Sequence, residues 1–260
     1  MADCLEQLAN ADNKTLASWL DNVFVLGWRK PFEDCISHDH GEPETGDIVK
    51  LYERADETLQ TRIDTAMATV VTNFTTGKAG AEWGHEYSVK DKPLMFEALL
   101  YIMGKIGIVD LIVEPLTELI LSGEYKGVQL NQNWNLHERL LSILEVVDFI
   151  PENLVDFCLE GIRDDEQSQY FERYFLLGAL HNETIYREGF DKYMTHLSGL
   201  SGSFIEEDRP QCVIDMGLIN PTAYEELMPK WLEGQNDTPV IQEMRTAYKT
   251  AMSKEIEPNL

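Results

Sequence analysis

The sequence has 260 residues, 43% hydrophobic and 26% charged, a composition that supports a sizeable buried core and excludes an intrinsically disordered chain. Acidic residues number 46 against 21 basic ones, so the formal net charge is -25, which disfavours binding to nucleic acid or anionic membranes. No apolar run approaches the ~20 residues that span a bilayer, and the opening residues lack a signal-peptide pattern. We therefore expect a cytoplasmic protein with a basic partner.

Residues 1–92 are predicted to form an N-terminal helical region. Residues 14–26 have the pattern of a helix, and apolar side chains at helical spacing from Ile48 to Val70 predict one long helix over residues 47–74. Strand-like alternation bounded by turn residues is not evident. This part of the chain is therefore expected to be all-α.

Between those helices, residues 35–44 read CISHDHGEPE and contain donors that zinc accepts, namely Cys35, His38, His40 and Glu42. The two histidines are only two positions apart in a polar segment, and neither a second ligand cluster nor a C-x-x-C pair accompanies them. We interpret the segment as a solvated linker and predict no metal and no cofactor. A metal-dependent enzyme that uses residues 35–42 remains the alternative.

Residues 81–93, AEWGHEYSVKDKP, place His85 beside Glu86 and between Trp83 and Tyr87. A histidine next to a carboxylate is capable of acid-base chemistry, but no activated nucleophile stands nearby. The sequence also lacks a nucleophile elbow, a phosphate loop and a dinucleotide fingerprint. We therefore interpret the segment as a loop that the aromatic pair anchors, and predict that the chain is not an enzyme.

From residue 93 onward, apolar positions recur at helical spacing and are separated by cap and turn residues. Pro93 opens a helix that Gly107 interrupts, and a second helix follows over residues 109–121. Asn135 with Glu138 forms a capping-box pattern, and Pro151 starts the next helix. Further starts are predicted at Asn182, at Asn220 with Pro221 and at Thr238 with Pro239, with a short helix at residues 213–218. The aromatic series Tyr170, Phe171, Tyr174 and Phe175 is interpreted as core packing.

The helix pairs repeat about every 35 to 40 residues, a period typical of helical-repeat proteins. In this spacing, residues 93–234 resemble HEAT or armadillo-type repeats, although no family consensus is present. The predicted fold is therefore an all-α, HEAT-like α-solenoid over residues 93–260 with an N-terminal helical extension. One continuous compact helical domain remains the alternative.

The leading functional hypothesis is a non-enzymatic protein-protein interaction module, an acidic helical scaffold that binds a basic protein or peptide. The resemblance implies that the second helix of each pair lines a concave face. The residues expected to contact the partner are Asp156, Glu160, Arg187, Asp191, Glu225 and Glu226. The same charge also fits an immunity-type inhibitor that covers the site of a basic nuclease, and this alternative stays open.

Overall fold

The computed structural model describes residues 4–26, 45–130, 135–163, 171–201 and 203–253. All regular elements in these ranges are helical, which confirms the predicted all-α class. The α-helices are α1 (Cys4–Asn10), α2 (Asn13–Leu26), α3 (Thr45–Arg54), α4 (Glu57–Thr75), α5 (Pro93–Ile106), α6 (Val113–Ser122), α7 (Leu136–Leu144), α8 (Glu152–Arg163), α9 (Phe171–His181), α10 (Glu183–Gly199), α11 (Ser203–Ile219), α12 (Pro221–Glu233) and α13 (Pro239–Ser253). Two short 3-10 helices are η2 (Ala81–Trp83) and η3 (Val109–Ile112). Within the described ranges, none of the helices combines the length and the apolar character that a membrane span requires.

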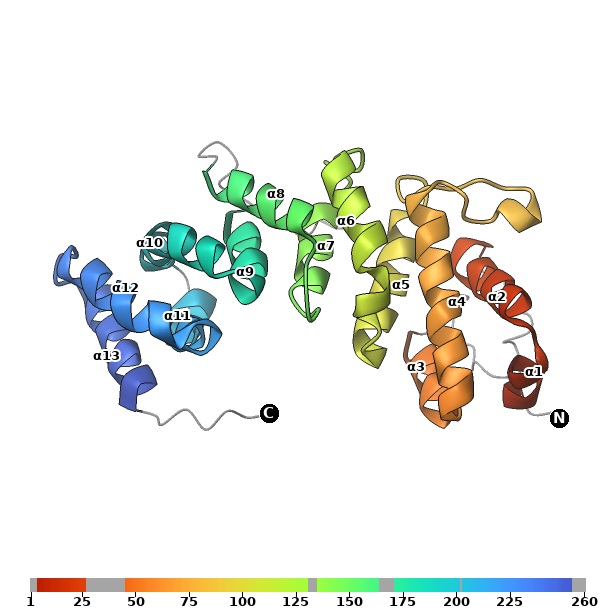
Figure 1. The fold of residues 1–260 in the computed structure, drawn as a ribbon, viewed down its shortest axis with the longest axis horizontal. Coiled ribbons are helices and arrows are strands. Elements are labelled where there is room, and N and C mark those ends of the chain that lie inside the picture. Colours follow the sequence, from red (N-terminus) through yellow and green to blue (C-terminus); the bar gives the residue numbers. More distant parts are fainter. Residues whose placement is uncertain (1–3, 27–44, 131–134, 164–170, 202, 254–260) are drawn as a thin grey trace. The chain divides into compact units, whose positions relative to one another are not determined.

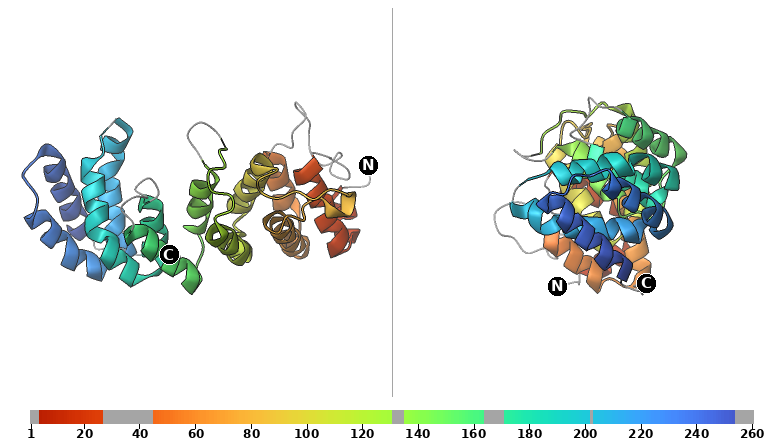
Figure 2. Two further views of the ribbon diagram at one scale, coloured as in Figure 1. Left: turned by 90° about the horizontal axis from the view of Figure 1, so that it is seen from above. Right: turned by 90° about the vertical axis from the view of Figure 1, so that its left-hand side faces the viewer.

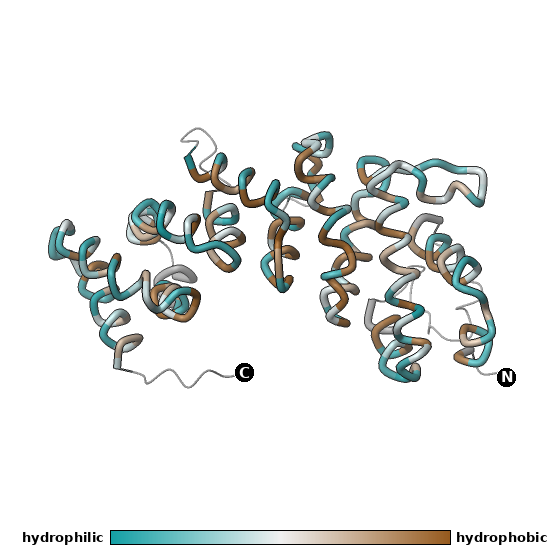
Figure 3. The backbone as a smooth tube through the Cα atoms, in the orientation of Figure 1, coloured by the Kyte–Doolittle hydropathy of each residue, from teal (hydrophilic) through white to brown (hydrophobic). Residues whose placement is uncertain are grey.

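The chain divides into two compact units, Met1–Leu154 and Val155–Leu260. In unit 1, α2 packs against α4, and α5 packs against α2, α3 and α4 (Figure 1). The core of this unit contains Leu16, Met67, Phe74 and Phe96, which are fully buried. Figure 3 shows that α5 and α6 carry long hydrophobic stretches, in keeping with their place against several neighbouring helices.

One predicted helix of unit 1 is two helices. The expected helix over residues 47–74 is wrong in extent, because α3 ends at Arg54 and α4 begins at Glu57. The Asp56 carboxylate accepts a hydrogen bond from the Leu59 backbone N–H at 2.8 Å, so it caps the start of α4. Aspartate at this position satisfies a helix N–H group that has no intrahelical partner, and the chain changes direction there.

In unit 2, α9 and α10 pack against each other across the tight connection at Asn182, and α11 packs against both α12 and α13 (Figure 2). The rings of Phe175 and Tyr193 stack with centroids 4.7 Å apart, and Phe190 meets Tyr224 edge to face. Buried aromatic rings dominate this core, as the sequence predicts for Phe171, Tyr174 and Phe175. Tyr170 lies outside the described residues.

The helix caps predicted for the second half of the chain are present. The side chains of Asn135, Asn182 and Asn220 each accept a backbone N–H from the first turn of the following helix. Gly107 ends α5 in a left-handed conformation, with φ of 75°, where a side chain would be strained.

The short helix predicted at residues 213–218 is longer in the structure. It forms the C-terminal part of α11, which begins at Ser203 and contains Pro210 in its interior. A proline removes one backbone donor and strains the preceding turn, so a helix that continues through it depends on tertiary contacts. The neighbouring Arg209 makes such contacts, because its guanidinium group is buried and bonds to residues of other segments.

Candidate functional site

The six residues predicted to contact a partner lie on three helices of unit 2. Asp156 and Glu160 belong to α8, Arg187 and Asp191 to α10, and Glu225 and Glu226 to α12. The five carboxylates are exposed and Arg187 is half-buried. Each of the three helices therefore presents acidic side chains to solvent, although they come from segments far apart in the sequence.

Two of these residues bind each other. Arg187 Nη1 lies 2.8 Å from Glu226 Oε2, and Arg187 Nε lies 2.7 Å from Glu183 Oε1. The hydrogen bonds that Arg187 donates to Glu226 and then to Glu183 raise the pKa of Arg187, and the hydrogen bonds that Glu226 accepts from Arg187 and then from Lys230 lower the pKa of Glu226. This pair is engaged within the chain, which makes Arg187 and Glu226 poorer candidates for partner contact than the sequence indicated.

The remaining carboxylates are available. Among the described residues, Asp156, Glu160, Asp191 and Glu225 form no ion pair and accept no side-chain hydrogen bond. Their side chains are exposed and charged, so a cationic group of another molecule can approach them without displacing an internal partner.

Ion pairs join the three helices that carry these carboxylates. Arg163 at the end of α8 binds Glu188 of α10 through two guanidinium nitrogens, at 3.1 and 2.8 Å from Oε2. Lys192 Nζ donates to the Ile162 carbonyl at 2.8 Å, and Arg187 joins α10 to α12. These contacts hold α8 next to α10 and α10 next to α12, so the acidic side chains of the three helices belong to one connected part of unit 2.

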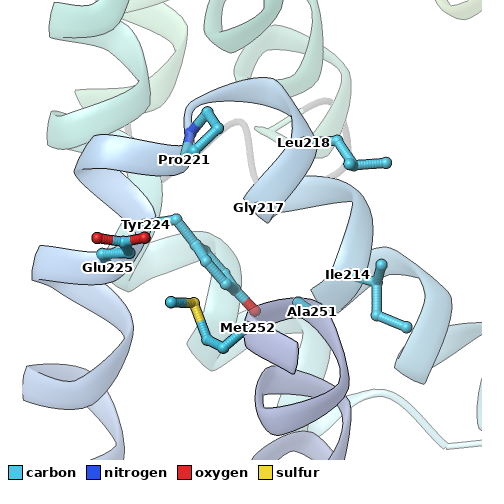
Figure 4. A pocket seen from close by; sticks show the side chains of 8 residues that line it. All are labelled: Ile214, Gly217, Leu218, Pro221, Tyr224, Glu225, Ala251 and Met252. Carbon is cyan, nitrogen blue, oxygen red and sulfur yellow. The ribbon is translucent and has the colours of Figure 1, made fainter. Parts of the chain in front are cut away.

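An apolar pocket of about 240 Å³ lies between α11, α12 and α13. Figure 4 shows that the Tyr224 ring and the Met252 side chain lie within it, with Leu218 and Ile214 on α11 and Glu225 on α12 at its edge. The Tyr224 hydroxyl donates to the Val213 carbonyl at 2.8 Å. The hydroxyl is therefore already hydrogen-bonded, and Tyr224 contributes its apolar ring to the pocket. Leu218 is 53% exposed and Met252 43% exposed, so both apolar side chains are accessible from solvent at the pocket.

The sequence did not reveal this pocket. Leu218 and Met252 fall at helical spacing with buried residues and resemble core positions in the sequence. Glu225 was selected because it is a charged residue on the predicted second helix of a pair, and the structure places it beside the apolar pocket. The pocket walls come from three helices, so their juxtaposition depends on tertiary packing that the periodicity of one helix does not encode.

The structure describes only one of the two segments that the sequence analysis considered as chemical sites, residues 81–93, and not residues 35–44. Cys35, His38, His40 and Glu42 lie outside the described residues. In the described part of the chain, no three His, Cys, Asp or Glu side chains are grouped so as to hold a metal ion. His85 and Glu86 are exposed on the loop after η2, where the His85 ring stacks on Tyr87 with centroids 5.5 Å apart.

A buried carboxylate anchors the loop that contains His85. Trp83 is 39% exposed, whereas the loop is held to α2 by the Asp21 carboxylate, which accepts the Gly80 backbone N–H at 2.7 Å. The sequence analysis missed this buried polar contact, and the anchoring role of Trp83 and Tyr87 stays a prediction.

No protein-family model, curated protein or solved structure matches the chain with significant similarity. The fold and the site together define an all-α protein with an acidic surface and an apolar pocket in unit 2.

Proposed function

We propose that unit 2 binds a basic segment of another protein. In this proposal, Lys or Arg side chains of the partner contact the available carboxylates of α8, α10 and α12, and one apolar side chain of the partner enters the pocket beside Glu225. The observation that carries the proposal is this combination of an unpaired, exposed carboxylate and an open apolar pocket on the same stretch of α12. An apolar anchor supplies affinity, whereas surrounding charges select the partner and speed its association.

The helix arrangement supports the repeat hypothesis in part. We propose that α9 with α10, and α11 with α12 and α13, are HEAT or armadillo-like units, since repeats of these classes contain two or three helices. The second helices α10 and α12 pack against each other and both carry exposed carboxylates. This is the placement that a binding surface on second helices requires.

A random peptide library panned against the folded chain tests the proposal. We expect enriched peptides to combine several Lys or Arg residues with one large apolar residue. Removing the two exposed apolar walls of the pocket, in Leu218→Ala with Met252→Ala, is expected to weaken binding of an enriched peptide by about 10-fold or more. Leu180→Ala is the matched control, because Leu180 is 44% exposed in the same unit but does not line the pocket.

Charge reversals test the second half of the proposal. The triple variant of α8 and α10 is expected to slow association of such a peptide about 10-fold at low salt and much less at high salt; its changes are Asp156→Lys, Glu160→Lys and Asp191→Lys. A control with the same change in net charge reverses three exposed carboxylates of unit 1, namely Glu53→Lys, Glu86→Lys and Glu118→Lys. Equal slowing by both triple variants would mean that total charge, and not this surface, guides the partner, and the proposal would fail.

A further inference from the structure

Three large apolar side chains are exposed close together in unit 1. Leu111 of η3 is 53% exposed, and Val146 and Phe149, in the connection between α7 and α8, are 66% and 56% exposed. The Asp148 backbone N–H donates to Asp110 Oδ1 at 3.2 Å, which joins this connection to the start of η3. Leu111 directly follows Asp110 in the chain, and Val146 and Phe149 lie before and after the donor residue. We refer to Leu111, Val146 and Phe149 as the unit 1 patch.

The charged residues of the two segments that form the unit 1 patch are all acidic. Residues 106–125 and 140–153 contain no lysine or arginine. The exposed carboxylates closest to the patch along the chain belong to Asp110, Glu114, Asp148 and Glu152. None of these carboxylates forms an ion pair within the described part of the chain. An apolar surface bordered by unpaired negative charge is complementary to a partner that combines apolar with cationic side chains.

Two other occupants fit the unit 1 patch less well. A second copy of the chain that docked through the same patch would bring these carboxylates against their own counterparts, because a two-fold contact pairs a surface with itself. Each copy would also carry a formal net charge of -25. An anionic lipid surface would meet the same repulsion. A cationic partner is therefore the occupant that the charges favour.

We propose that the unit 1 patch is a docking surface for a cationic amphipathic helix of a partner protein. The apolar face of that helix covers Leu111, Val146 and Phe149, and its lysine or arginine side chains pair with the carboxylates around them. Apolar burial supplies affinity, and the charges orient and select the helix. The patch shares no residue with the pocket and the carboxylates proposed for unit 2, so either proposal can fail without the other.

The probe is a synthetic amphipathic helix of leucine and lysine with one photoreactive benzoylphenylalanine on its apolar face. After the peptide has bound the purified full-length chain and has been irradiated, we expect the cross-links to fall mainly within residues 106–125 and 140–153. A second peptide has the same lysines but serine in place of every leucine, and we expect it to bind about 10-fold more weakly or worse. Equal binding of the two peptides would show that net charge alone holds the probe, and the proposal would fail.

Matched double variants locate the site. Val146→Ser with Phe149→Ser is expected to weaken binding of the leucine-lysine peptide about 10-fold or more. Both side chains are exposed, so the unfolding temperature is expected to change little. Leu94→Ser with Leu180→Ser, which changes two apolar side chains that are 60% and 44% exposed elsewhere, is expected to leave binding unchanged. If both double variants weaken binding equally, or if the cross-links fall only on α11, α12 and α13 of unit 2, the proposal is overturned.

Discussion

His137 of α7 is a buried histidine whose ionisation opposes folding. It is 3% exposed, and its Nδ1 lies 2.8 Å from the Tyr125 hydroxyl. Burial, with a smaller effect of the Lys126 charge, lowers the pKa of His137 from 6.5 to about 4. The unfolded chain takes up a proton here below about pH 6.5, and the folded chain only near pH 4, so this group's stabilising contribution is present above pH 6.5 and is lost as the pH falls.

We predict that His137 contributes up to about 3 kcal/mol to the loss of unfolding free energy between pH 7 and pH 4. Urea unfolding at several pH values, in the unchanged chain and in His137→Gln, measures this contribution. The variant is expected to be less stable at pH 7 and to lose less stability on acidification, because glutamine does not titrate. Parallel pH profiles for the two chains would contradict the prediction.

Arg209 of α11 is the largest buried side chain of unit 2 that carries a charge. It is 2% exposed, donates to the carbonyls of Leu197 and Leu200 at 3.1 and 2.6 Å, and forms a 2.8 Å ion pair with Glu243 of α13. Its guanidinium group thus supplies hydrogen bonds to carbonyl groups at the C-terminal end of α10, and its ion pair with Glu243 links α11 to α13.

Replacing Arg209 by methionine is expected to lower the free energy of unfolding by about 2 to 4 kcal/mol, because two carbonyls lose their donor and Glu243 loses its partner. Arg245→Met is the matched control, since Arg245 also pairs with a carboxylate and a carbonyl but is 39% exposed; its expected cost is about 0 to 1 kcal/mol. Chemical denaturation of both variants checks the difference. An equal loss of unfolding free energy in the two variants would show that burial of Arg209 adds nothing to the stability of the chain.

At the scale of helices, close approach between α9 and α10 depends on glycine. A Cβ atom at Gly189 of α10 would lie 2.3 Å from the Phe175 ring of α9, and that ring is itself stacked against Tyr193. Gly178 of α9 is in a similar position, because a Cβ there would lie 2.5 Å from Ile185. The two helices therefore pack at a distance that side chains at these positions would not permit.

Gly189→Ala is expected to destabilise the chain by about 1 to 3 kcal/mol, since overpacking exceeds the gain in helix propensity. Gly104→Ala in α5 is expected to stabilise it by about 0.5 to 1 kcal/mol, because no atom lies within 4 Å of the new Cβ and the position is helical. Thermal unfolding of the two variants measures these opposite signs. A stabilising Gly189→Ala would show that α9 and α10 separate at little cost.

Helix starts and ends were predictable where a local hydrogen bond defines them. Asn135, Asn182 and Asn220 cap helices as their sequence context indicates, and Gly107 ends α5. The break at Asp56 was missed because apolar positions continue in phase across it, and periodicity alone does not register a cap. The start of α11 was missed, because the sequence analysis does not show that a helix continues through Pro210, where the buried Arg209 donates to the Leu197 carbonyl.

At the scale of the whole molecule, the all-α class was predictable from the sequence. The pairing and burial of the residues at the candidate sites were not. The acidic residues of α8, α10 and α12 were identified because charge is visible in the sequence. Their internal pairing, such as Arg187 with Glu226, was not, because the two residues are far apart along the chain. Asp21 was overlooked since a single aspartate in a helix is ordinarily exposed, and only the fold of residues 76–92 over α2 buries it.

The net charge of -25 has a consequence for the stability of the whole chain. Even if every lysine and arginine formed an ion pair, 25 carboxylates would remain without a basic partner. Their mutual repulsion acts over distances similar to the Debye length, which shrinks from about 30 Å at 0.01 M salt to about 8 Å at 0.15 M. Repulsion between like charges is stronger in the compact folded state than in the expanded unfolded chain.

We therefore predict that the unfolding temperature rises by several degrees when sodium chloride is increased from about 0.01 to 0.3 M, because screening weakens this repulsion. Thermal unfolding followed by circular dichroism measures the rise, with a neutral osmolyte at equal osmolality as the control for solvent effects. Neutralising exposed carboxylates of unit 1, in Glu53→Gln, Glu86→Gln and Glu118→Gln, is expected to reduce the dependence on salt. An unfolding temperature that stays constant or falls with added salt would show that favourable ion pairs, such as Arg163 with Glu188, outweigh the excess negative charge.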